Sequence, residues 1–546
     1  MDILLQRNQA YRWYRGDGIA VKGYVQRKDA PDTVLRDAAA AAYFAEADSF
    51  EAFLARLEAV DGVFAVVMQP TPDTTWAAVD RARSMPLYYA ADGSAISDDS
   101  EYLRTHLGIA KDDTDPLRMA ELMTAGAVSD RYTVYEKIRQ LLLGTAAEWQ
   151  DGALRTAVYY RHLSPVREIS REQAKAALRK TAERVIDNIL KVVGERPIVL
   201  SLSGGYDSRF LACMLKERGA RDVYCYTYGD SRSFEVVQSK KVADALGYAW
   251  NCVTYTDEDV AGQLDEAGVS YIDACYQHDF ITYLQNYIAV KRLHEKGWFP
   301  KNAVFLTGLC HDMPTGAYQE QEEDVHYPIS ADGAAAYTLD RRFVRYRLKK
   351  DAREVYFADL RRQIDALGKE IETYQDFVQV VDALNTGFDH SRRFLPMNHI
   401  HEFFGYEWLL PCWNQELLDF WYSLPYTLRV RQNLYEEWLM TDLCEKYGVG
   451  TKKHINQHTP YPWLNAIVRQ VGGAVAWYCF KTHTALRLRT DINGGATLRQ
   501  RLYDGIVQKQ AIKYSRASQP LLQALYFMEK RYGTHFWKDV RNVLKK

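Results

Sequence analysis

No cysteine precedes Cys213 in this 546-residue chain. The eight cysteines all lie between Cys213 and Cys479, and none forms a CxxC pair or a His–Cys cluster at zinc spacing. This arrangement indicates neither a disulfide framework nor a zinc site. The chain also lacks an apolar run long enough to cross a bilayer and a signal-like N-terminal segment. These absences predict a cytoplasmic protein with no membrane span.

The chain has little net charge, with 69 Lys and Arg residues against 71 Asp and Glu residues and a formal net charge of −2. Whole-chain electrostatics therefore give no reason to expect a nucleic-acid partner. The stretch from Lys481 onward is basic, but its interleaved Leu, Tyr and Phe favour amphipathic helices with a solvated face. With 47% hydrophobic and 26% charged residues, a chain of this length predicts a globular protein of two or three domains.

The pattern of short segments changes near residue 165. Residues 1–165 alternate short apolar strands with turns around a helical insert at residues 31–60, which is an α+β pattern. From Ser170 onward, helices and strands alternate, which predicts parallel βαβ units and a doubly wound sheet. We therefore expect an α+β domain at 1–165 and an α/β domain at 166–546 whose C-terminal part is largely helical.

The most informative segment is RPIVLSLSGGYDSRFLACMLKERG, residues 196–219. A buried apolar strand precedes residues 203–208 and an amphipathic helix follows them, so this segment forms a strand-to-helix turn. Adjacent glycines let the backbone approach an anion, while the helix N-terminus and serine hydroxyls can bind phosphate oxygens. The predicted phosphate-binding residues are Ser203, Gly204, Gly205 and Ser208.

Asp207 is an unusual residue in such a turn, because a carboxylate repels phosphate unless a divalent cation lies between them. Its presence predicts magnesium carried with the nucleotide. The turn has no lysine after its glycines, so it is not a Walker A loop, and it lacks the dinucleotide-binding spacing. A glycine-rich turn that is merely capped by Asp and Ser is the structural alternative.

The segment SGGYDS resembles the pyrophosphate-binding loop of the ATP pyrophosphatase superfamily, whose members cleave ATP between the α and β phosphates. GVFAVVM, DRARSMPLYY, ISDDSEYLR and YTVYEKIRQLLLGTAAEWQDG resemble, in order, the N-terminal domain of asparagine synthetases. YTYGDSRSFEVVQSKKVADALG, FLTGLCHDMPTGAY and YEWLLPCWNQELLDFWYSLP are similar to segments of their synthetase domain. The resemblance covers nearly the whole chain. It implies an Ntn-hydrolase-like, class II glutamine amidotransferase-like domain at 1–165 and an ATP-binding synthetase domain at 166–546.

In that family the N-terminal domain hydrolyses glutamine with an N-terminal cysteine. This sequence has Asp2 at that place. A carboxylate cannot replace a thiolate paired with a free α-amino group, so we expect no glutaminase activity and a scaffold role for the domain. Members without the cysteine include β-lactam synthetases and lasso peptide cyclases, in which an amine of the substrate is the nucleophile.

The resemblance also implies the ligands of the nucleotide. Asp207 and Asp312 match its magnesium ligands, from the ends of two strands. Thr307 and Gly308 match residues that line the nucleotide site, and Tyr228 falls near the adenine. ATP and Mg²⁺ are the cofactors that this set of residues predicts. The structural alternatives are that Asp312 caps a turn and that Tyr228 is a core residue.

Two further residues are predicted to be catalytic. Glu407 matches the Glu of the family's ExRxPFLD segment, and a Glu in an aromatic stretch could take a proton from an ammonium nucleophile. Lys453 matches the lysine of its RxKxGF segment, where a cation would stabilise the negative charge of the transition states. His311 is a second candidate base. A structurally hydrogen-bonded Glu407 and a solvated Lys453 are the alternatives.

The sequence departs from the family at the acceptor loop. Leu309 stands where asparagine synthetases have Glu and β-lactam synthetases have Tyr, while Cys310 and His311 replace Gly and Ser. These departures predict a substrate other than aspartate. The resemblance as a whole implies an AMP-forming carbon–nitrogen ligase that joins a small-molecule or peptide carboxylate to an amine or ammonia. Amidation of a surface-sugar uronate and closure of a lactam or peptide ring are examples from specialised metabolism and surface-polysaccharide synthesis.

Several alternatives remain open from the sequence. One is an asparagine synthetase that uses free ammonia, and another is a non-catalytic paralogue that binds nucleotide, for which Leu309 is the best support. A tRNA-modifying enzyme would share the phosphate-binding loop but would leave the N-terminal resemblance unexplained. A homodimer is compatible with the sequence.

Overall fold

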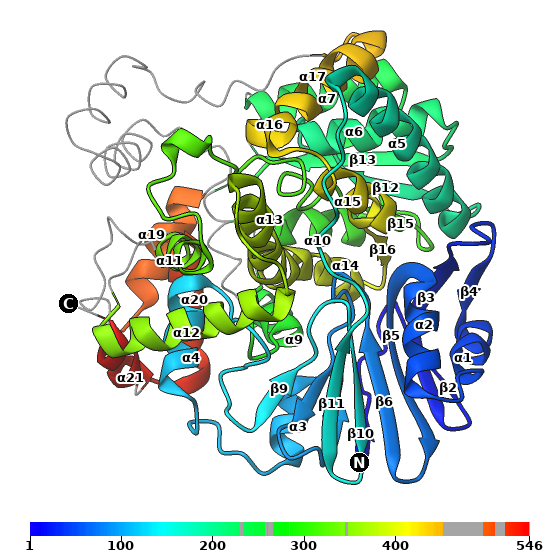
Figure 1. The fold of residues 1–546 in the computed structure, drawn as a ribbon. Helices are drawn as coiled ribbons and strands as arrows, with labels where there is room; N and C mark the ends of the chain where they lie inside the picture. Colours follow the sequence, from blue (N-terminus) through cyan, green and yellow to red (C-terminus); the bar gives the residue numbers. More distant parts are fainter. Residues whose placement is uncertain are drawn as a thin grey trace.

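The computed structural model describes residues 1–450, 495–507, 519–534 and 536–544, except residues 230, 232, 257–258, 260–265, 283, 285 and 344–347. It contains two sheets of mainly antiparallel strands in the N-terminal part, a parallel sheet in the middle of the chain, and C-terminal helices beside both (Figure 1). None of the described helices is both long and apolar enough to cross a bilayer.

The N-terminal part forms two sheets. The smaller has the strand order β1-β8-β7-β9 and the larger β11-β10-β6-β5-β3-β2, with β4 paired to β3; apart from parallel β1 and β8, the pairs are antiparallel. The strands are β1 (Asp2–Leu4), β2 (Trp13–Gly16), β3 (Ile19–Arg27), β4 (Val34–Arg36), β5 (Val60–Thr71), β6 (Thr74–Val79), β7 (Tyr88–Ala90), β8 (Ala95–Ser97), β9 (Ile138–Gln140), β10 (Thr145–Gln150) and β11 (Ala153–Val158). The helices are α1 (Asp37–Ala45), α2 (Phe50–Glu58), α3 (Ser100–His106) and α4 (Pro116–Ala125).

Both faces of β5, near the middle of the larger sheet, are buried over residues 63–68, and successive side chains of the strand point to opposite faces. In β5, Phe64, Val66 and Met68 belong to a core cluster with residues of α1 and α2. Val63, Ala65 and Val67 point to the opposite face and belong to the main core of the protein. The α+β character expected for this part is therefore present.

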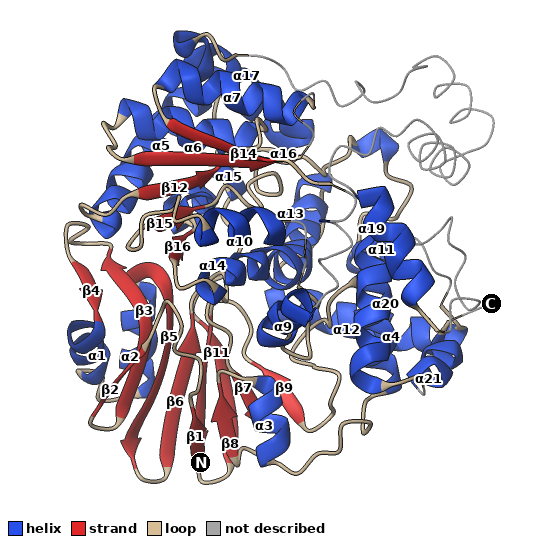
Figure 2. Ribbon diagram, turned by 180° about the vertical axis from the view of Figure 1, so that it is seen from behind, coloured by secondary structure: helices blue, strands red, loops and turns tan. Residues whose placement is uncertain are grey.

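The middle of the chain forms a parallel five-stranded sheet with the order β14-β13-β12-β15-β16. Its strands are β12 (Ile198–Ser201), β13 (Val223–Tyr228), β14 (Ala249–Val253), β15 (Val304–Leu306) and β16 (Glu407–Leu409). Helices lie on both sides of it (Figure 2), among them α5 (Arg171–Val193), α6 (Tyr206–Glu217), α7 (Phe234–Leu246) and α10 (Tyr287–Glu295). Helix α9 (Glu266–Cys275) lies farther from the sheet, against α14. The strand order reverses between β12 and β15, and ligands of such sheets bind at that point beyond the carboxyl ends of the strands.

The rest of the described chain is largely helical, as expected. Its α-helices are α11 (Ala331–Arg342), α12 (Lys350–Leu367), α13 (Tyr374–Asn385), α14 (His399–Phe403), α15 (Gln415–Tyr422), α16 (Tyr426–Arg429), α17 (Asn433–Trp438), α19 (Gly495–Gly505), α20 (Gln519–Tyr532) and α21 (Phe536–Val543). Two π-helical segments are η2 (Thr386–Phe394) and η6 (Leu439–Cys444), and short 3₁₀ turns are η1 (Glu322–Asp324), η3 (Leu395–Asn398), η4 (Pro411–Trp413), η5 (Val430–Gln432) and η7 (Glu445–Tyr447). Helix α4 of the N-terminal part packs against α20 and α21 (Figure 1).

A buried polar cluster joins the N-terminal part to α14. His399 Nδ1 lies 2.9 Å from Glu402 Oε2, and both side chains are less than a tenth exposed. Although burial by itself raises the pKa of Glu402, the hydrogen bond from His399 and the charges of Lys22 and Arg7 lower it to about 2. The ionised form of Glu402 is therefore a favourable part of this interface.

This cluster gives a pH dependence of stability. Because the pKa of Glu402 is lower in the folded protein than its ordinary value of 4.5, its contribution is present above about pH 4.5 and is lost as the pH falls toward about 2. We expect the free energy of unfolding, measured with urea, to lose about 2 kcal/mol from this group between about pH 5 and about pH 3. The Glu402→Gln variant should lack this part of the decline. A wild type and a variant with parallel pH profiles would contradict the assignment.

Candidate nucleotide-binding site

The predicted phosphate-binding turn lies between β12 and α6. Gly205 is the N-cap of α6, so the amides of the first turn of that helix point out beyond the strand. Gly204 has φ of +71°, and a Cβ there would come within 2.8 Å of Gln238 Cβ on α7. The turn therefore requires glycine at 204, and its exposed amides suit an anion.

The two serines of the turn face each other. Ser203 Oγ lies 3.3 Å from Ser208 Oγ and accepts a hydrogen bond from Gly205 N at 3.3 Å. Ser208 Oγ also donates to Gly205 O at 3.3 Å. These contacts gather two hydroxyls at the N-terminus of α6, where both could reach phosphate oxygens.

The loop after β15 meets this turn directly. A Cβ on Gly308 would lie 3.0 Å from Asp207 Cβ and 3.1 Å from its backbone carbon, so the glycine permits the close approach of the two loops. Thr307 N donates to Leu409 O at 3.3 Å, and its buried hydroxyl has no hydrogen-bond partner among the described residues. A buried, unpaired hydroxyl beside a glycine-rich turn is suited to a ligand.

Asp207 is held by two other segments. Tyr435 Oη on α17 donates to Asp207 Oδ1 at 3.1 Å, and His311 Nδ1 lies 3.5 Å from the same oxygen. Burial, followed by the charge of Asp207, raises the pKa of Tyr435 well above its ordinary value, so its hydroxyl keeps the proton that it donates. Trp421 Nε1 on α15 donates to His311 Nε2 at 3.1 Å.

Asp312 lies one residue beyond His311 and has partners of its own. Tyr318 Oη donates to Asp312 Oδ2 at 2.5 Å, and His390 Nε2 of the π-helical segment η2 lies 3.9 Å from Oδ1. Burial alone raises the pKa of Asp312, but the interactions with His390 and Tyr318 outweigh it and leave the pKa below its ordinary value. A lowered pKa favours the ionised carboxylate of Asp312, which is the form that binds a cation.

Cys310 precedes these residues with a left-handed backbone, at φ of +65°. Such a conformation costs about 1–2 kcal/mol for a residue with a side chain. Burial and then the charges of Asp312 and Asp207 raise the pKa of Cys310 well above its ordinary value, so its thiol is neutral. The strained backbone turns the loop so that His311 points inward and Asp312 follows it.

These residues fit a magnesium nucleotide. The described residues contain no group of three or more His, Cys, Asp or Glu side chains that could hold a metal by themselves. Magnesium bound with a nucleotide needs only one or two carboxylates, because phosphate oxygens and water complete its octahedral shell. Asp207 and Asp312 come from the two loops at the switch point of the sheet, which matches that requirement.

Tyr228, at the carboxyl end of β13, lies on the same edge of the sheet. Tyr226 pairs with Ser201, so Tyr228 is level with Ser203 of the turn. Its ring is stacked on Tyr255, with centroids 5.5 Å apart and planes 11° from parallel. The stacked pair could border a purine, and it also contributes to the core.

The structure does not bring Glu407 to this edge. Glu407 begins β16 and pairs with Val304 at the start of β15, so it lies at the amino edge of the sheet, roughly 10 Å along the strand direction from Thr307. Its carboxylate lies 3.1 Å from Arg36 Nη1 of the N-terminal part and 2.6 Å from Arg196 Nη1. This position corrects the assignment of Glu407 as the base and gives it a structural ion-pair role instead.

The Glu407→Gln variant tests this placement. We expect the rate of the nucleotide-dependent reaction to change by less than about threefold, because the side chain is remote from the phosphate-binding turn. The thermal midpoint should fall by a few degrees, since one Gln cannot satisfy both arginines. Loss of the reaction in a variant with an unchanged thermal midpoint would restore Glu407 to the reaction.

Lys453, the other predicted catalytic residue, lies outside the described residues. Of the other predicted site residues, the first loop holds Ser203, Gly204, Gly205, Asp207 and Ser208, and Gly308 of the second loop, which also holds Thr307, lies against Asp207. Asp312 belongs to the second loop and directly follows His311, whose Nδ1 lies 3.5 Å from Asp207 Oδ1.

Sequence reasoning missed three partners of the site. Trp421 and Tyr435 come from helices far along the chain from the turn, and no spacing in the sequence connects them to Asp207. Arg209 directly follows the turn and is fully buried, with Nε 3.3 Å from Gly205 O and Nη1 2.9 Å from Val449 O. Only Arg209 had a signal in the sequence, because it is a charged residue among the apolar positions of the helix that follows the turn.

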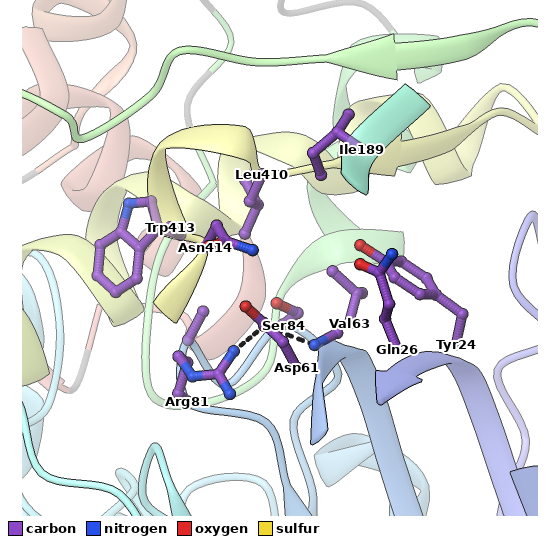
Figure 3. A pocket seen from close by; sticks show the side chains of 12 residues that line it. Tyr24, Gln26, Asp61, Val63, Arg81, Ser84, Ile189, Leu410, Trp413 and Asn414 are labelled. Atoms are coloured by element: carbon purple, nitrogen blue, oxygen red, sulfur yellow. Dashed lines mark hydrogen bonds and ion pairs between the residues drawn. The ribbon is translucent and has the colours of Figure 1, made fainter. Parts of the chain in front are cut away.

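A cavity lies apart from this site, between the N-terminal sheet and the segment after β16 (Figure 3). Arg81 and Asp61 point toward one another in its wall, and Asn414 and Trp413 border it from the other side. Its volume is about 20 Å³, which is enough for one water molecule and not for a substrate.

Asp2, which stands where the family has its glutaminase cysteine, is the first residue of β1. Its exposed carboxylate lies 3.0 Å from His106 Nε2. This side chain therefore makes a surface contact with α3.

Comparison with known proteins agrees with the site. The family model described as asparagine synthase matches residues 177–457, slightly more than half of the chain. This match begins within α5 and includes all five strands of the parallel sheet. A search of the curated proteins finds no match.

Proposed function

This chain belongs to the asparagine synthase family, and from that premise we propose that it is an ATP-dependent amide-forming ligase that releases AMP and pyrophosphate. The substrate carboxylate attacks the α-phosphate of ATP, the bond to the β-phosphate breaks, and an acyl-adenylate forms. An amine or ammonia then attacks the acyl carbon, and AMP leaves. The observation that carries the proposal is that the Ser203–Ser208 turn, which holds Asp207, meets the loop that carries Gly308 and Asp312 at the switch point of the sheet.

The residues of the two loops have separate tasks. The Ser203 and Ser208 hydroxyls and the first amides of α6 would bind the departing pyrophosphate. Asp207 and Asp312 would hold Mg²⁺, which neutralises phosphate charge and polarises the phosphorus–oxygen bonds. Thr307 and Gly308 would line the nucleotide, and Tyr228 would border its base. Lys453 would stabilise the negative charge that develops on oxygen in both steps.

The nitrogen donor is proposed to be an amine or free ammonia, and not glutamine. The sequence has no cysteine before Cys213, and the Asp2 carboxylate makes a surface contact with His106. We propose that residues 1–165 retain an Ntn-hydrolase-like fold as a scaffold and that residues 166–546 form the synthetase domain. Leu309 stands in the acceptor loop, so the carboxylate substrate is proposed to be other than aspartate, such as a uronic acid or a peptide carboxylate.

The proposal is tested by pyrophosphate release from Mg·ATP with a panel of carboxylic acids, including aspartate, uronic acids and a cell extract. Hydroxylamine is added to trap the acyl-adenylate as a hydroxamate, whose mass identifies the acid. Acid-dependent release with equal amounts of AMP and hydroxamate is the expected outcome. No release with any acid or extract, in protein shown to bind ATP, would favour a non-catalytic nucleotide-binding role.

The same assay separates two kinds of nitrogen donor. If the amine belongs to the activated molecule, product forms without ammonium and pyrophosphate release is unaffected by it. If ammonia is the donor, product formation rises with ammonium concentration until the site is saturated. A yield of aspartate hydroxamate above that of all other acids would instead favour an ammonia-dependent asparagine synthetase.

A further inference from the structure

Three buried side chains form a continuous hydrogen-bonded path that ends at Asp207. Trp421 on α15, His311 in the loop after β15 and Tyr435 on α17 are each fully buried. The His311 ring lies between aromatic neighbours, with centroids 5.4 Å from Phe210, 4.8 Å from Tyr435 and 6.0 Å from Trp421. The path therefore joins three separate segments of the synthetase part to the turn that carries Asp207.

The donors in this path fix the tautomer of His311. An indole N–H can only donate, so the 3.1 Å contact from Trp421 Nε1 makes His311 Nε2 an acceptor without a proton. A neutral imidazole then carries its proton on Nδ1, which faces Tyr435 Oη at 3.2 Å and Asp207 Oδ1 at 3.5 Å. His311 consequently has no free nitrogen with which to accept a substrate proton.

The last hydrogen bond of the path, from Tyr435 to Asp207, orients the Asp207 carboxylate. Since His311 Nδ1–H donates toward Tyr435 Oη, the tyrosine hydroxyl is left to donate its own proton to Asp207 Oδ1, at 3.1 Å. All donors in the path thus run in one direction, from Trp421 to Asp207. The hydrogen bond from Tyr435 Oη and the 3.5 Å approach of His311 Nδ1 both fall on Oδ1, and no hydrogen bond from the described residues falls on Oδ2.

We propose that Trp421, His311 and Tyr435 are positioning residues that hold Asp207 Oδ1 and present Oδ2 to the magnesium of the nucleotide. This inference rests on the proposed function, because it takes Asp207 as a magnesium ligand. It assigns His311 to orientation of that ligand and not to proton transfer. Because every donor in the path points toward Asp207, the path holds the Asp207 side chain in one orientation. A carboxylate that binds the magnesium of a nucleotide has to be oriented in this way.

The first test observes the tautomer directly in the full chain. Protein labelled with ¹⁵N-histidine is examined by NMR, and the His311 signals are assigned by their loss in His311→Asn. We expect Nδ1 to give the signal of a protonated ring nitrogen and Nε2 that of an unprotonated one. In Trp421→Phe this single-tautomer pattern should be lost, whereas Trp438→Phe, which removes another buried indole, should retain it. A wild-type spectrum with the proton on Nε2, or on both nitrogens, would overturn the proposal.

The second test measures metal binding without turnover. Mn²⁺ serves as the probe, and its binding in the presence of ATP is followed by electron paramagnetic resonance. We expect Tyr435→Phe to weaken Mn²⁺ binding about tenfold, as second-layer ligand partners commonly do. Tyr422→Phe is the matched control, because Tyr422 Oη is also buried and hydrogen-bonded, to Thr386 Oγ1 at 2.8 Å, but does not touch Asp207. Its Mn²⁺ affinity should equal that of the wild type.

The outcomes separate this inference from the proposed reaction. Equal Mn²⁺ affinity of the wild type and Tyr435→Phe would overturn the positioning role, and so would a wild type that binds no Mn²⁺ with ATP. If no carboxylic acid supports pyrophosphate release but the tautomer and the tenfold loss are observed, the positioning role stands and the proposed ligase reaction falls. If release occurs and Tyr435→Phe matches the wild type in both Mn²⁺ affinity and rate, only the positioning role falls.

Discussion

Asp207→Asn should lower acid-dependent pyrophosphate release from Mg·ATP on the order of 10³-fold. Asn keeps the size of the side chain and can still accept the hydrogen bond from Tyr435 Oη, but it removes the negative charge beside the phosphate-binding turn. The metal then loses a carboxylate ligand from one of the two loops, and the reacting phosphate loses its orientation. The measurement is the rate of pyrophosphate release at saturating ATP and acid.

The control for this variant is Asp244→Asn. Asp244 is an exposed residue of α7 whose partner is Lys240, at 2.8 Å, so its charge lies on the surface. We expect its rate to remain within about twofold of the wild type. If Asp207→Asn also stayed within that range at low and high magnesium, Asp207 would not be a magnesium ligand.

Asp382→Ala should lower the free energy of unfolding by about 3–5 kcal/mol, because it leaves a buried arginine without its counter-ion. Arg429 Nη2 lies 2.7 Å from Asp382 Oδ2, and both side chains are at most 5% exposed. Gln319 Nε2 donates to the same carboxylate oxygen at 2.9 Å, and Arg429 Nε donates to Pro314 O at 2.8 Å. Asp382 thereby anchors the segment that follows Asp312.

Urea unfolding followed by far-ultraviolet circular dichroism measures this loss. Asp340→Ala is the comparison, since Asp340 pairs with Arg353 at 2.6 Å but both side chains are at least 40% exposed. An exposed pair of this kind contributes at most about 1 kcal/mol. A loss in Asp382→Ala no larger than that in Asp340→Ala would show that Arg429 finds another partner.

The phosphate-binding turn could be predicted from the sequence because its signals are local. An apolar strand, two glycines and an amphipathic helix follow each other between Arg196 and Gly219, and the structure has each of them. The contact between Gly308 and Asp207 could not be predicted from local signals, because it depends on the pairing of β15 with β12. Strand order is a property of the whole sheet, and only the resemblance indicated it.

Glu407 shows why a matching motif can still be misplaced. Residues 407–409 form one short strand, and its two ends face opposite edges of the sheet, about 7 Å apart. The register with β15 decides which end faces the nucleotide, and this register is set by long-range pairing. Trp421 and Tyr435 were missed for a related reason, since a hydrogen bond between buried aromatic residues leaves no periodic trace in a sequence.

Helix α4 has a consequence for how the protein can be divided. Although it lies in the N-terminal part, it packs against α20 and α21 at the far end of the chain, and Arg118 forms a buried ion pair with Asp359 Oδ2 of α12 at 2.5 Å. Cutting the chain at residue 165 would separate this helix from α20 and α21, expose to water the apolar residues that they bury together, and remove Arg118 from Asp359. Because these buried contacts cross the boundary at residue 165, we expect a chain cut there to leave both parts less stable than the whole protein.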